Sequence, residues 1–283
     1  MDCFKNKQII INKILVNYLI TIKNNKLRKI IDYSFYGGKR LRPMIILVLC
    51  NKFNIEYRIR NKLIIGIELL HNASLIMDDM PDMDNDNFRR NRFSIHNKYG
   101  ISTAKIISNY MLNEGMSNFT FYLKKDILIR INKFINEKNK DICLGQYYDL
   151  NFNNLEDLKN IDNTTKLYYL NLKTIPLFSI CFVVPYIISK NLYNSIIYND
   201  LELISIHFSY MFQICDDYED LESDKINNAN NHILIFGSKL TYEMYLDSEN
   251  NYKKLVEKCR IQDSFFDNLL NYLNNKIKIN IKK

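Results

Sequence analysis

Apolar residues recur along most of this chain at the spacing of an α-helix. Between residues 8 and 33 the isoleucine and leucine side chains stand one, three, four and five positions apart, which forms a helical stripe. Gly37 and Gly38 interrupt the pattern, and Pro43 suits the first turn of the next helix. The predicted helical segments cover residues 8–33, 44–53, about 61–80, 101–123, 126–149, 164–189 and 194–223, with two weaker helices within 238–280.

The same pattern sets the fold class. Strict alternation of apolar and polar residues is hard to find, and the 283 residues include only 7 Gly and 4 Pro. So few turn-forming residues disfavour an all-β fold. No Gly/Ser-rich linker or internal repeat divides the chain, and 47% hydrophobic residues are ordinary for a globular protein. We predict an all-α fold in a single domain, residues 1–283.

Charge and cysteine content indicate which partners and which cell compartment to expect. The net charge is +8, but the lysines are scattered without an aromatic-plus-basic motif, so no nucleic-acid partner is expected. We interpret the C-terminal KIKINIKK as a solvated tail. Six cysteines form no C-x-x-C and no His pair has zinc spacing, so free thiols in a reducing compartment are expected. The N-terminus has no signal-peptide pattern and the uncharged run 174–189 is short for a membrane span. These observations predict a cytoplasmic protein without a transmembrane segment.

Acidic residues crowd the end of one predicted helix, in LHNASLIMDDMPDMDNDNFRRNR at residues 70–92. His71, Ser74 and Asp78 share a helical face, and Pro81 disfavours helix in the residue before it. Asp78 and Asp79 should therefore occupy the last turn, and the loop beyond should carry three more carboxylates: Asp82, Asp84 and Asp86. A helix C-terminus repels carboxylates, so a cation must compensate, and hard oxygens at this density suit Mg²⁺.

Two arginines follow the acidic cluster at once. Arg89 and Arg90 cannot bind a metal, but they can bind a phosphate with bidentate geometry. The alternative is a solvated acidic loop that these arginines neutralise.

A second acidic cluster, FQICDDYEDLESD at residues 212–224, ends another apolar helix. Asp216, Asp217 and Asp220 share one helical face with Gln213. A second trio of carboxylates at the end of a second apolar helix is unusual for a solvated face. Two such helices facing each other would form a metal cage open to a polyphosphate.

Basic residues provide the counterpart. GGKRLRP, residues 37–43, places Lys39, Arg40 and Arg42 beside a Gly-Gly hinge, where the backbone can approach a ligand closely. Lys173 precedes an apolar helix, where it is either a ligand contact or an exposed cap. For His71, which shares a face with Asp78, a ligand contact is favoured over a neutral core histidine.

These motifs together resemble the trans-isoprenyl diphosphate synthases, the short-chain polyprenyl synthases, between about residues 34 and 237. GGKRLRP matches the first basic motif, and HNASLIMDDMPDMDNDNFRR resembles the longer form of the first Asp-rich motif. LGQYYDL resembles the Gly-Gln-x-x-Asp helix, LKT the Lys-Thr motif, and FQICDDYED the second Asp-rich motif. The resemblance implies an all-α bundle around a deep central cavity, usually in a homodimer.

The resemblance also implies a role for each matching residue. Three Mg²⁺ would bind the allylic diphosphate, with Asp78 and Asp84 as the main contacts of the first motif and Asp79 and Asp82 supporting. The second motif would contribute Asp216, with Asp217 and Asp220 near it. Arg89 and Lys173 would hold the diphosphate of the allylic substrate. Isopentenyl diphosphate would be held by Lys39, Arg42, His71 and Arg90, with Arg40 beside them.

The reaction implied is the condensation of isopentenyl diphosphate with dimethylallyl, geranyl or farnesyl diphosphate. Metals, Lys and Arg neutralise the leaving diphosphate, and an allylic carbocation forms. The double bond of isopentenyl diphosphate attacks this cation, and released diphosphate takes the proton. Thr174 and Gln213 offer oxygen dipoles near the cation, with Lys173 beside them.

Small residues set the expected product length. The residue five before the first Asp lines the tail pocket in the family, where a large aromatic shortens the product. Here Ala73 occupies that position and Ser74 follows it. We therefore predict a product longer than farnesyl diphosphate, namely geranylgeranyl diphosphate.

Three positions depart from the family pattern. Ile175 replaces a common Gly, Met77 replaces a common His, and Ala229 stands where a Lys is common. The last change should weaken one diphosphate contact and lower the turnover rate.

Three alternatives stay open from the sequence. A class I terpene cyclase would need a different second motif, which NDLELISIHF starts but does not complete, and it would need no isopentenyl site. A non-catalytic synthase subunit would tend to lose an Asp-rich motif, and both stand here. A farnesyl or longer-chain synthase differs only in product length.

Overall fold

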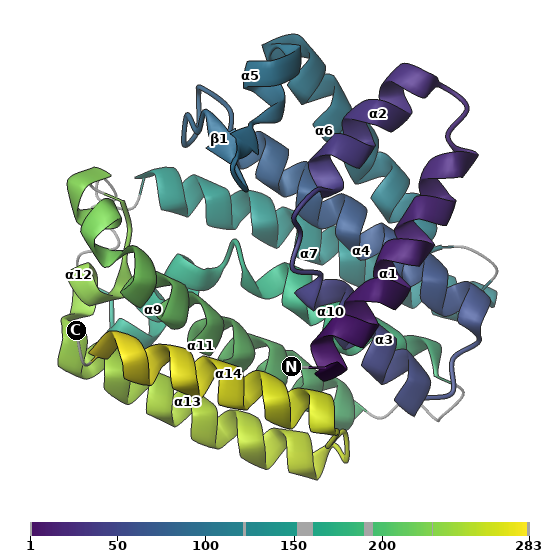
Figure 1. The fold of residues 1–283 in the computed structure, drawn as a ribbon. Helices are drawn as coiled ribbons and strands as arrows, with labels where there is room; N and C mark the ends of the chain where they lie inside the picture. The colour runs from purple at the N-terminus through teal and green to yellow at the C-terminus, as the bar shows by residue number, and fades with distance from the viewer. Residues whose placement is uncertain (1, 121–122, 152–160, 190–194, 228, 282–283) are drawn as a thin grey trace. The chain divides into compact units, whose positions relative to one another are not determined.

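The computed structural model describes residues 2–120, 123–151, 161–189, 195–227 and 229–281, and within them helices dominate (Figure 1). The predicted all-α class is therefore confirmed. The helices are α1 Asp2–Thr21, α2 Asn25–Phe35, α3 Leu41–Lys52, α4 Tyr57–Asp78, α5 Ile95–Tyr99, α6 Ile101–Asn118, α7 Lys125–Asn151, α9 Asn163–Asn171, α10 Ile175–Ile188, α11 Ser195–Asn227, α12 His232–Phe236, α13 Ser238–Lys258 and α14 Ser264–Ile281.

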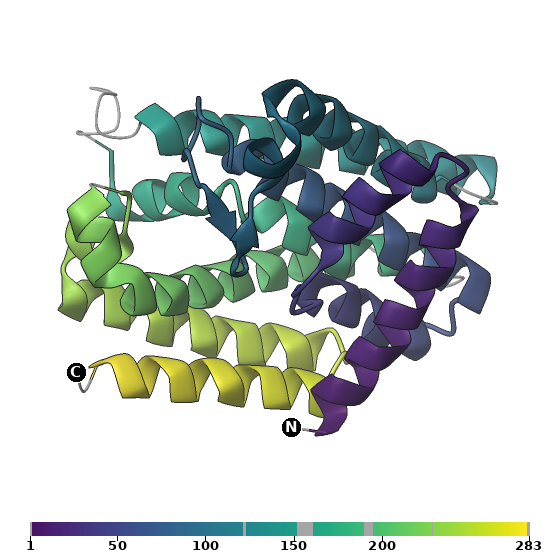
Figure 2. The ribbon, with the colours of Figure 1, turned by 45° about the horizontal axis from the view of Figure 1, so that its top comes forward.

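Contacts between Cα atoms divide the chain into two compact units. The first unit comprises Met1–Ile135 with Ile187–Ser189, and the second comprises Asn136–Tyr186 with Lys190–Lys283. In the first unit α4 packs against α6, α3 and α1. In the second, α11 packs against α12, α13 and α14, and Figure 2 shows the last two running along it. The single domain expected from the sequence stays a prediction.

Two of the predicted helical segments are interrupted. The stripe over residues 8–33 breaks at residues 22–24, because the Asn24 side chain accepts hydrogen bonds from the backbone N–H groups of Lys26 and Leu27 and so caps a new helix. The segment 164–189 breaks at residues 172–174, between α9 and α10. This second break matters for function, because it contains the predicted Lys-Thr motif.

A small hairpin follows the first acidic cluster, which the sequence pattern did not predict. Strands β1 Phe88–Arg89 and β2 Arg92–Phe93 pair antiparallel. Arg90 and Asn91 form its turn with φ of 53° and 60°, the left-handed backbone that a two-residue hairpin needs. The rings of Phe88 and Phe93 stack across the strands with their centroids 4.9 Å apart. The hairpin thus fixes where both predicted phosphate-binding arginines lie.

Among the described residues no single helix is both long and apolar enough to cross a membrane. α9 and α10 reach the required length only as a pair, and the chain bends by 78° between them. The side chains of α10 are buried almost throughout, as in a core helix.

Candidate active site

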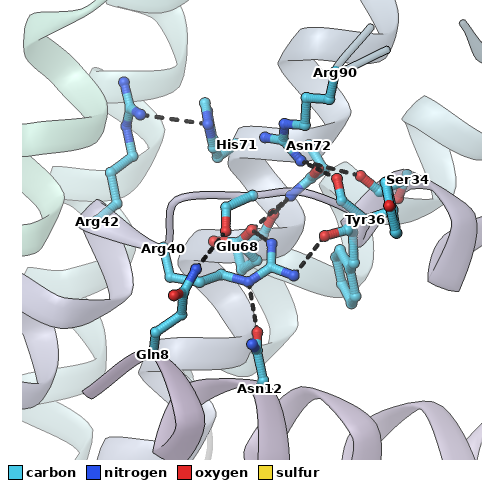
Figure 3. Close-up of polar contacts among 12 residues, drawn as sticks. Gln8, Asn12, Ser34, Tyr36, Arg40, Arg42, Glu68, His71, Asn72 and Arg90 are labelled. Atoms are coloured by element: carbon cyan, nitrogen blue, oxygen red, sulfur yellow. Dashed lines mark hydrogen bonds and ion pairs between the residues drawn. The ribbon is translucent and has the colours of Figure 1, made fainter. Parts of the chain in front are cut away.

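The basic turn between α2 and α3 presents Lys39 and Arg42. Lys39 is exposed, and half-buried Arg42 lies with Nη1 3.4 Å from Nε2 of His71 on α4 (Figure 3). Desolvation, followed by the positive charges of Arg42 and other arginines, holds the pKa of His71 well below its usual range. The ring is therefore neutral at pH 7 and accepts a hydrogen bond from Arg42. This arrangement leaves both cations suited to an anionic ligand.

Arg40 is buried in the first unit, and the substrate contact predicted for it stays a prediction. It is 8% exposed and donates to Glu68 Oε1 at 2.5 Å, to Asn12 Oδ1 at 2.9 Å and to the Phe35 carbonyl (Figure 3). A Cβ on Gly38 would lie 2.1 Å from its guanidinium, so a larger residue there would have to displace the Arg40 side chain. Because Arg40 connects α1, α4 and the end of α2 through these bonds, it fixes the shape of the turn.

The two hairpin arginines hold different parts of the first unit. Arg89 donates from Nε to Asp79 Oδ1 at 2.8 Å and from Nη2 to Asp86 at 3.3 Å. Arg90 donates to the carbonyls of Tyr36 at 3.0 Å and Ser34 at 3.4 Å, which precede the basic turn (Figure 3). The hairpin is thus tied to the acidic cluster through Arg89 and to the basic turn through Arg90.

The two residues of the first Asp pair, Asp78 and Asp79, differ in burial and in their partners. Asp78 is half-buried in the last turn of α4, as predicted, whereas Asp79 is 3% exposed and carries the ion pair with Arg89. Burial raises the pKa of Asp79, and Arg89 partly offsets this. In this structure the buried Asp79 carboxylate positions Arg89. The supporting metal role predicted for Asp79 stays a prediction.

The other predicted acids of the first motif lie on the loop beyond α4. Asp84 is exposed, and its N–H donates to the Asp78 carbonyl at 3.0 Å, so the loop folds back on the helix end. Exposed Asp82 pairs with Lys105 on α6 at 3.2 Å. That hydrogen bond lowers the pKa of Asp82. Asp78 and Asp84 are thus brought together, and Asp82 faces a different partner.

The two predicted chain-length residues follow along α4. Ala73 is 3% exposed, and its carbonyl accepts a hydrogen bond from Ser108 Oγ on α6 at 2.8 Å. Ser74 is half-buried and its hydroxyl donates to the His71 carbonyl. Ala73 is therefore tied to α6 through its backbone carbonyl, whereas the Ser74 side chain bonds within α4.

In the second unit, Lys173 lies at the break between α9 and α10. Its Nζ is 2.5 Å from Oδ2 of Asp149 on α7. A Cβ on Gly145 would lie 2.3 Å from the Lys173 backbone nitrogen, so only glycine lets α7 approach the break this closely. Asn230 donates to both the carbonyl and the side chain of Asp149, at 2.6 and 3.2 Å. Three separated segments therefore fix the lysine.

The second Asp pair, Asp216 and Asp217, also has one buried and one more exposed member. Asp217 is 4% exposed and accepts hydrogen bonds from Gln213 Nε2 at 3.0 Å and from both the backbone N–H and Nδ1 of His232, at 2.7 and 2.6 Å. These donors hold the Asp217 carboxylate in place, and its predicted position near a metal stays a prediction. Gln213 in turn accepts from the Thr174 hydroxyl at 3.3 Å.

Asp216, the outer member of this pair, meets a lysine from the C-terminal helix. Lys276 Nζ lies 2.5 Å from Asp216 Oδ1 and 2.9 Å from Glu219 Oε2. Burial opposes the charge of Lys276, but the hydrogen bond and charge of Asp216 raise its pKa overall. Lys276 is 8% exposed, so the interpretation of KIKINIKK as a solvated tail is wrong at its first residue.

Comparison with known proteins decides the family. The sequence profile described as polyprenyl synthetase matches residues 24–232. A farnesyl diphosphate synthase of Buchnera aphidicola subsp. Acyrthosiphon pisum is 32% identical over 270 residues, which cover 92% of this chain and 90% of that protein. This chain belongs to the polyprenyl synthetase family.

Solved structures agree in fold. A geranyltransferase from Legionella pneumophila superposes with a TM-score of 0.81 at 21% identity, covering 97% of this chain and 99% of that one. A geranyltransferase from Helicobacter pylori, complexed with magnesium and isoprenyl diphosphate, gives 0.75 at 20% identity and covers 100% and 98%. The polyprenyl synthetase described here is a prenyltransferase of the trans-isoprenyl diphosphate synthase family.

The acidic residues of this synthetase fit Mg²⁺ by their chemistry. Among the described residues, no three His, Cys, Asp or Glu side chains converge closely enough to hold a metal alone. Exposed carboxylates that each contribute one or two oxygens suit an ion that shares a phosphate ligand. Burial, then the negative charges of Asp224, Asp216 and Glu219, raise the pKa of Asp220. A divalent cation would relieve this repulsion, so the donor set fits.

Several residues of the synthetase escaped the sequence prediction. Asp149, His232 and Lys276 each contact a predicted site residue, and Asn230 contacts Asp149. Asp149 belongs to LGQYYDL, where the motif itself offered a signal. The other three gave none, because their partners lie far away in the sequence.

The three residues that depart from the family pattern differ in their burial. Ile175 is 3% exposed and packs with Leu167 and Tyr210 in a core cluster, and Met77 is half-buried. Ala229 is exposed, and its N–H donates to the Asp224 carbonyl at 2.9 Å. The lower turnover rate expected from Ala229 stays a prediction.

Proposed function

We propose that this protein condenses isopentenyl diphosphate with an allylic diphosphate in a Mg²⁺-dependent reaction and releases geranylgeranyl diphosphate. The observation that carries the proposal is the presence of two Asp pairs, one at the end of α4 and one within α11, each with one buried and one half-buried carboxylate. In each pair the buried Asp holds a neighbouring group, and the half-buried Asp is the more accessible oxygen donor for a metal. That the Helicobacter pylori relative of this fold binds magnesium and isoprenyl diphosphate supports the choice of ion and substrate.

Bound Mg²⁺, for which the family resemblance implies three ions, would neutralise the diphosphate and make it a better leaving group. We assign Asp78, Asp84, Asp216 and Asp220 as its ligands. Asp82 is the supporting member of this set. Lys173 and Arg89 bind the allylic diphosphate directly, and each is already held by a carboxylate, Asp149 or Asp79, so little side-chain freedom remains to be lost on binding.

Lys39, Arg42 and Arg90 bind the diphosphate of isopentenyl diphosphate, with neutral His71 as a further polar contact. When the allylic C–O bond breaks, the electron pair leaves with diphosphate and a carbocation forms. The double bond of isopentenyl diphosphate supplies the electrons of the new C–C bond. The departing diphosphate then takes a proton from the carbon beside the new cation, which restores a double bond.

The length of the product is the finer part of the proposal. Ala73 favours geranylgeranyl diphosphate, because a small buried residue there leaves room for a longer tail. Farnesyl diphosphate is the second candidate, and the name of the Buchnera relative favours it.

We further propose a homodimer, which the family resemblance implies. Several apolar side chains of α6 are exposed in the single chain, namely Ile101, Ile106, Tyr110 and Leu112. Light scattering of the purified protein should give twice the mass of one chain, and a monomer at micromolar concentration would contradict this.

One assay tests the proposed function. The purified protein is incubated with isopentenyl diphosphate, Mg²⁺ and, separately, dimethylallyl, geranyl or farnesyl diphosphate, and the products are separated by chain length. We expect elongation of each primer to the C20 product and none in the presence of EDTA. Termination at C15 would identify a farnesyl synthase, and a longer ladder a long-chain synthase. Cyclic hydrocarbons or no turnover at all would overturn the proposal.

A further inference from the structure

A closed chain of hydrogen bonds connects the second Asp-rich motif to the Lys-Thr break. Asn171 Nδ2 lies 2.8 Å from His232 Nε2, and His232 Nδ1 lies 2.6 Å from Asp217 Oδ2. The chain continues through Gln213 to the Thr174 hydroxyl, and the Thr174 N–H donates to the Asn171 carbonyl at 2.8 Å. It therefore begins and ends at the same break.

The direction of each hydrogen bond in this chain can be assigned. Asn171 Nδ2 also lies 2.8 Å from the Leu167 carbonyl, and exchanging the amide N and O would bring two oxygens together there. Asn171 therefore donates to Nε2, which makes His232 a neutral ring with its proton on Nδ1. That proton is donated to Asp217, which accepts from Gln213 as well.

The tautomer of His232 determines how the Gln213 amide is oriented, at the other end of this series of hydrogen bonds. Because the Gln213 amide donates to Asp217, its Oε1 is turned toward Thr174 and accepts the hydroxyl proton. The oxygen lone pairs of Thr174 and Gln213 then form the negative end of the chain. Asn171, His232, Asp217 and Thr174 are all less than 9% exposed, so these orientations are not averaged by solvent.

We propose that His232 is a positioning residue of prenyl transfer, which acts through Asp217 to keep the oxygens of Gln213 and Thr174 directed toward the allylic carbocation. The proposal rests on the proposed function, because only that reaction develops positive charge beside these two residues. Fixed dipoles act on charge that develops in the transition state and need no reorganisation there. His232 therefore contributes to turnover without touching the substrate.

Two polar variants of His232 test the roles of its two ring nitrogens separately. In His232→Asn the side-chain amide can replace Nδ1 as the donor to Asp217, whereas the longer side chain of His232→Gln reaches toward Asn171. We expect H232Q to lower kcat by about 10- to 100-fold, the range found for outer partners of functional groups, and H232N to retain most of it. The KM of both diphosphates should change little in either variant. Equal kcat losses in the two variants, or a loss confined to KM, would overturn the proposal.

A binding measurement gives a readout that does not depend on turnover. The probe is an allylic diphosphate analogue with an ammonium nitrogen at the cationic carbon, compared by calorimetry with its uncharged carbon analogue, in the presence of Mg²⁺. H232Q should lose about tenfold in affinity for the ammonium analogue only, as expected for misdirected dipoles. An equal loss for both analogues would show that His232 serves only to keep the fold.

His207→Asn is the matched control, because this histidine lies on α11 with Gln213 but its ring contacts Tyr210. Its kcat and its affinity for both analogues should equal those of the wild type. If the wild type itself elongates no primer, the proposed function fails and this inference fails with it. If the wild type is active and H232N and H232Q are alike, only the inference fails.

Discussion

In the second Asp-rich motif, the carboxylates that would suit a metal repel one another in the folded protein. Burial and the negative charges of Asp224, Asp216 and Glu219 raise the pKa of Asp220 above its value in the unfolded chain. Asp224 is shifted in the same direction by burial, although a hydrogen bond from Asn231 opposes this. A carboxyl with a raised folded-state pKa favours folding below its unfolded pKa, near 4, and this contribution is lost as pH rises through the folded value.

We therefore expect Asp220→Asn to unfold at a higher temperature than the wild type at pH 7 in EDTA. The gain should shrink toward zero as the pH is lowered through the raised pKa, since the wild-type carboxyl is then protonated too. Thermal unfolding from pH 4 to 8 measures this, and Glu222→Gln, an exposed acid on the same helix, controls for net charge. A gain that is constant with pH, or equal in E222Q, would contradict the explanation.

Ala73 should determine product length through its volume alone. It is buried in α4 with its carbonyl bonded to α6. Under the proposed function, a larger side chain here would shorten the space available to the growing tail. In the series Ala73→Val, Ala73→Leu and Ala73→Phe we expect the main product to shorten progressively, from C20 to C15 or C10. Chromatography of the prenyl products measures it. An unchanged product distribution in A73F, with normal thermal stability, would sink the prediction.

At the level of elements, one close backbone approach helps to position Lys173. α7 touches the break between α9 and α10 at Gly145, where a Cβ would meet backbone atoms of Leu172 and Lys173 at 2.3–2.7 Å. Backbone cannot move aside as a flexible side chain can. The glycine of LGQYYDL is therefore explained by helix packing beside Lys173.

Gly145→Ala should push the break away from α7 and displace Lys173. We expect a loss of about 1–3 kcal/mol in the free energy of unfolding, the usual cost of overpacking, and a higher KM for the allylic diphosphate. Urea unfolding and steady-state kinetics measure the two effects. Cys143→Ala, an exposed position on the same helix, should change neither. Wild-type behaviour of G145A would show that the approach is not needed.

At the scale of the whole molecule, the end of the chain supports the second motif. α14 brings Lys276 to Asp216 and Glu219, about 60 residues earlier in the sequence. In the metal-free protein this lysine places a positive charge directly beside Asp216. The Mg²⁺ ion proposed to bind Asp216 would take over part of that neutralising role.

Lys276→Met should therefore lower the stability of the metal-free protein by roughly 1.5–3 kcal/mol, the cost of losing hydrogen bonds to charged groups. Added Mg²⁺ should raise the unfolding temperature of K276M more than that of the wild type. Lys278→Met, an exposed lysine on the same helix, is the control and should respond like the wild type. If Mg²⁺ stabilises all three proteins equally, Lys276 is not linked to metal binding.

The sequence alone determined the all-α class, most of the helix positions and the Asp-rich end of α4. It also located the second Asp-rich cluster, although Asp216, Asp217 and Asp220 lie inside α11 and not at its end. These features depend on apolar spacing and on residue types within a few turns, and such local patterns are written directly in the chain. It also indicated Lys173, Thr174 and Gln213 by motif, and the structure places Thr174 and Gln213 in contact.

Only the tertiary structure decided which member of each Asp pair is buried. Asp78 and Asp79, like Asp216 and Asp217, are neighbours of identical type, so no local pattern distinguishes them. Arg89 on an unpredicted hairpin takes Asp79, and His232 beyond the end of α11 takes Asp217. The same holds for Arg40, whose partner Glu68 lies on another helix. Burial of a charge depends on partners brought from elsewhere in the chain, and folding alone brings them together.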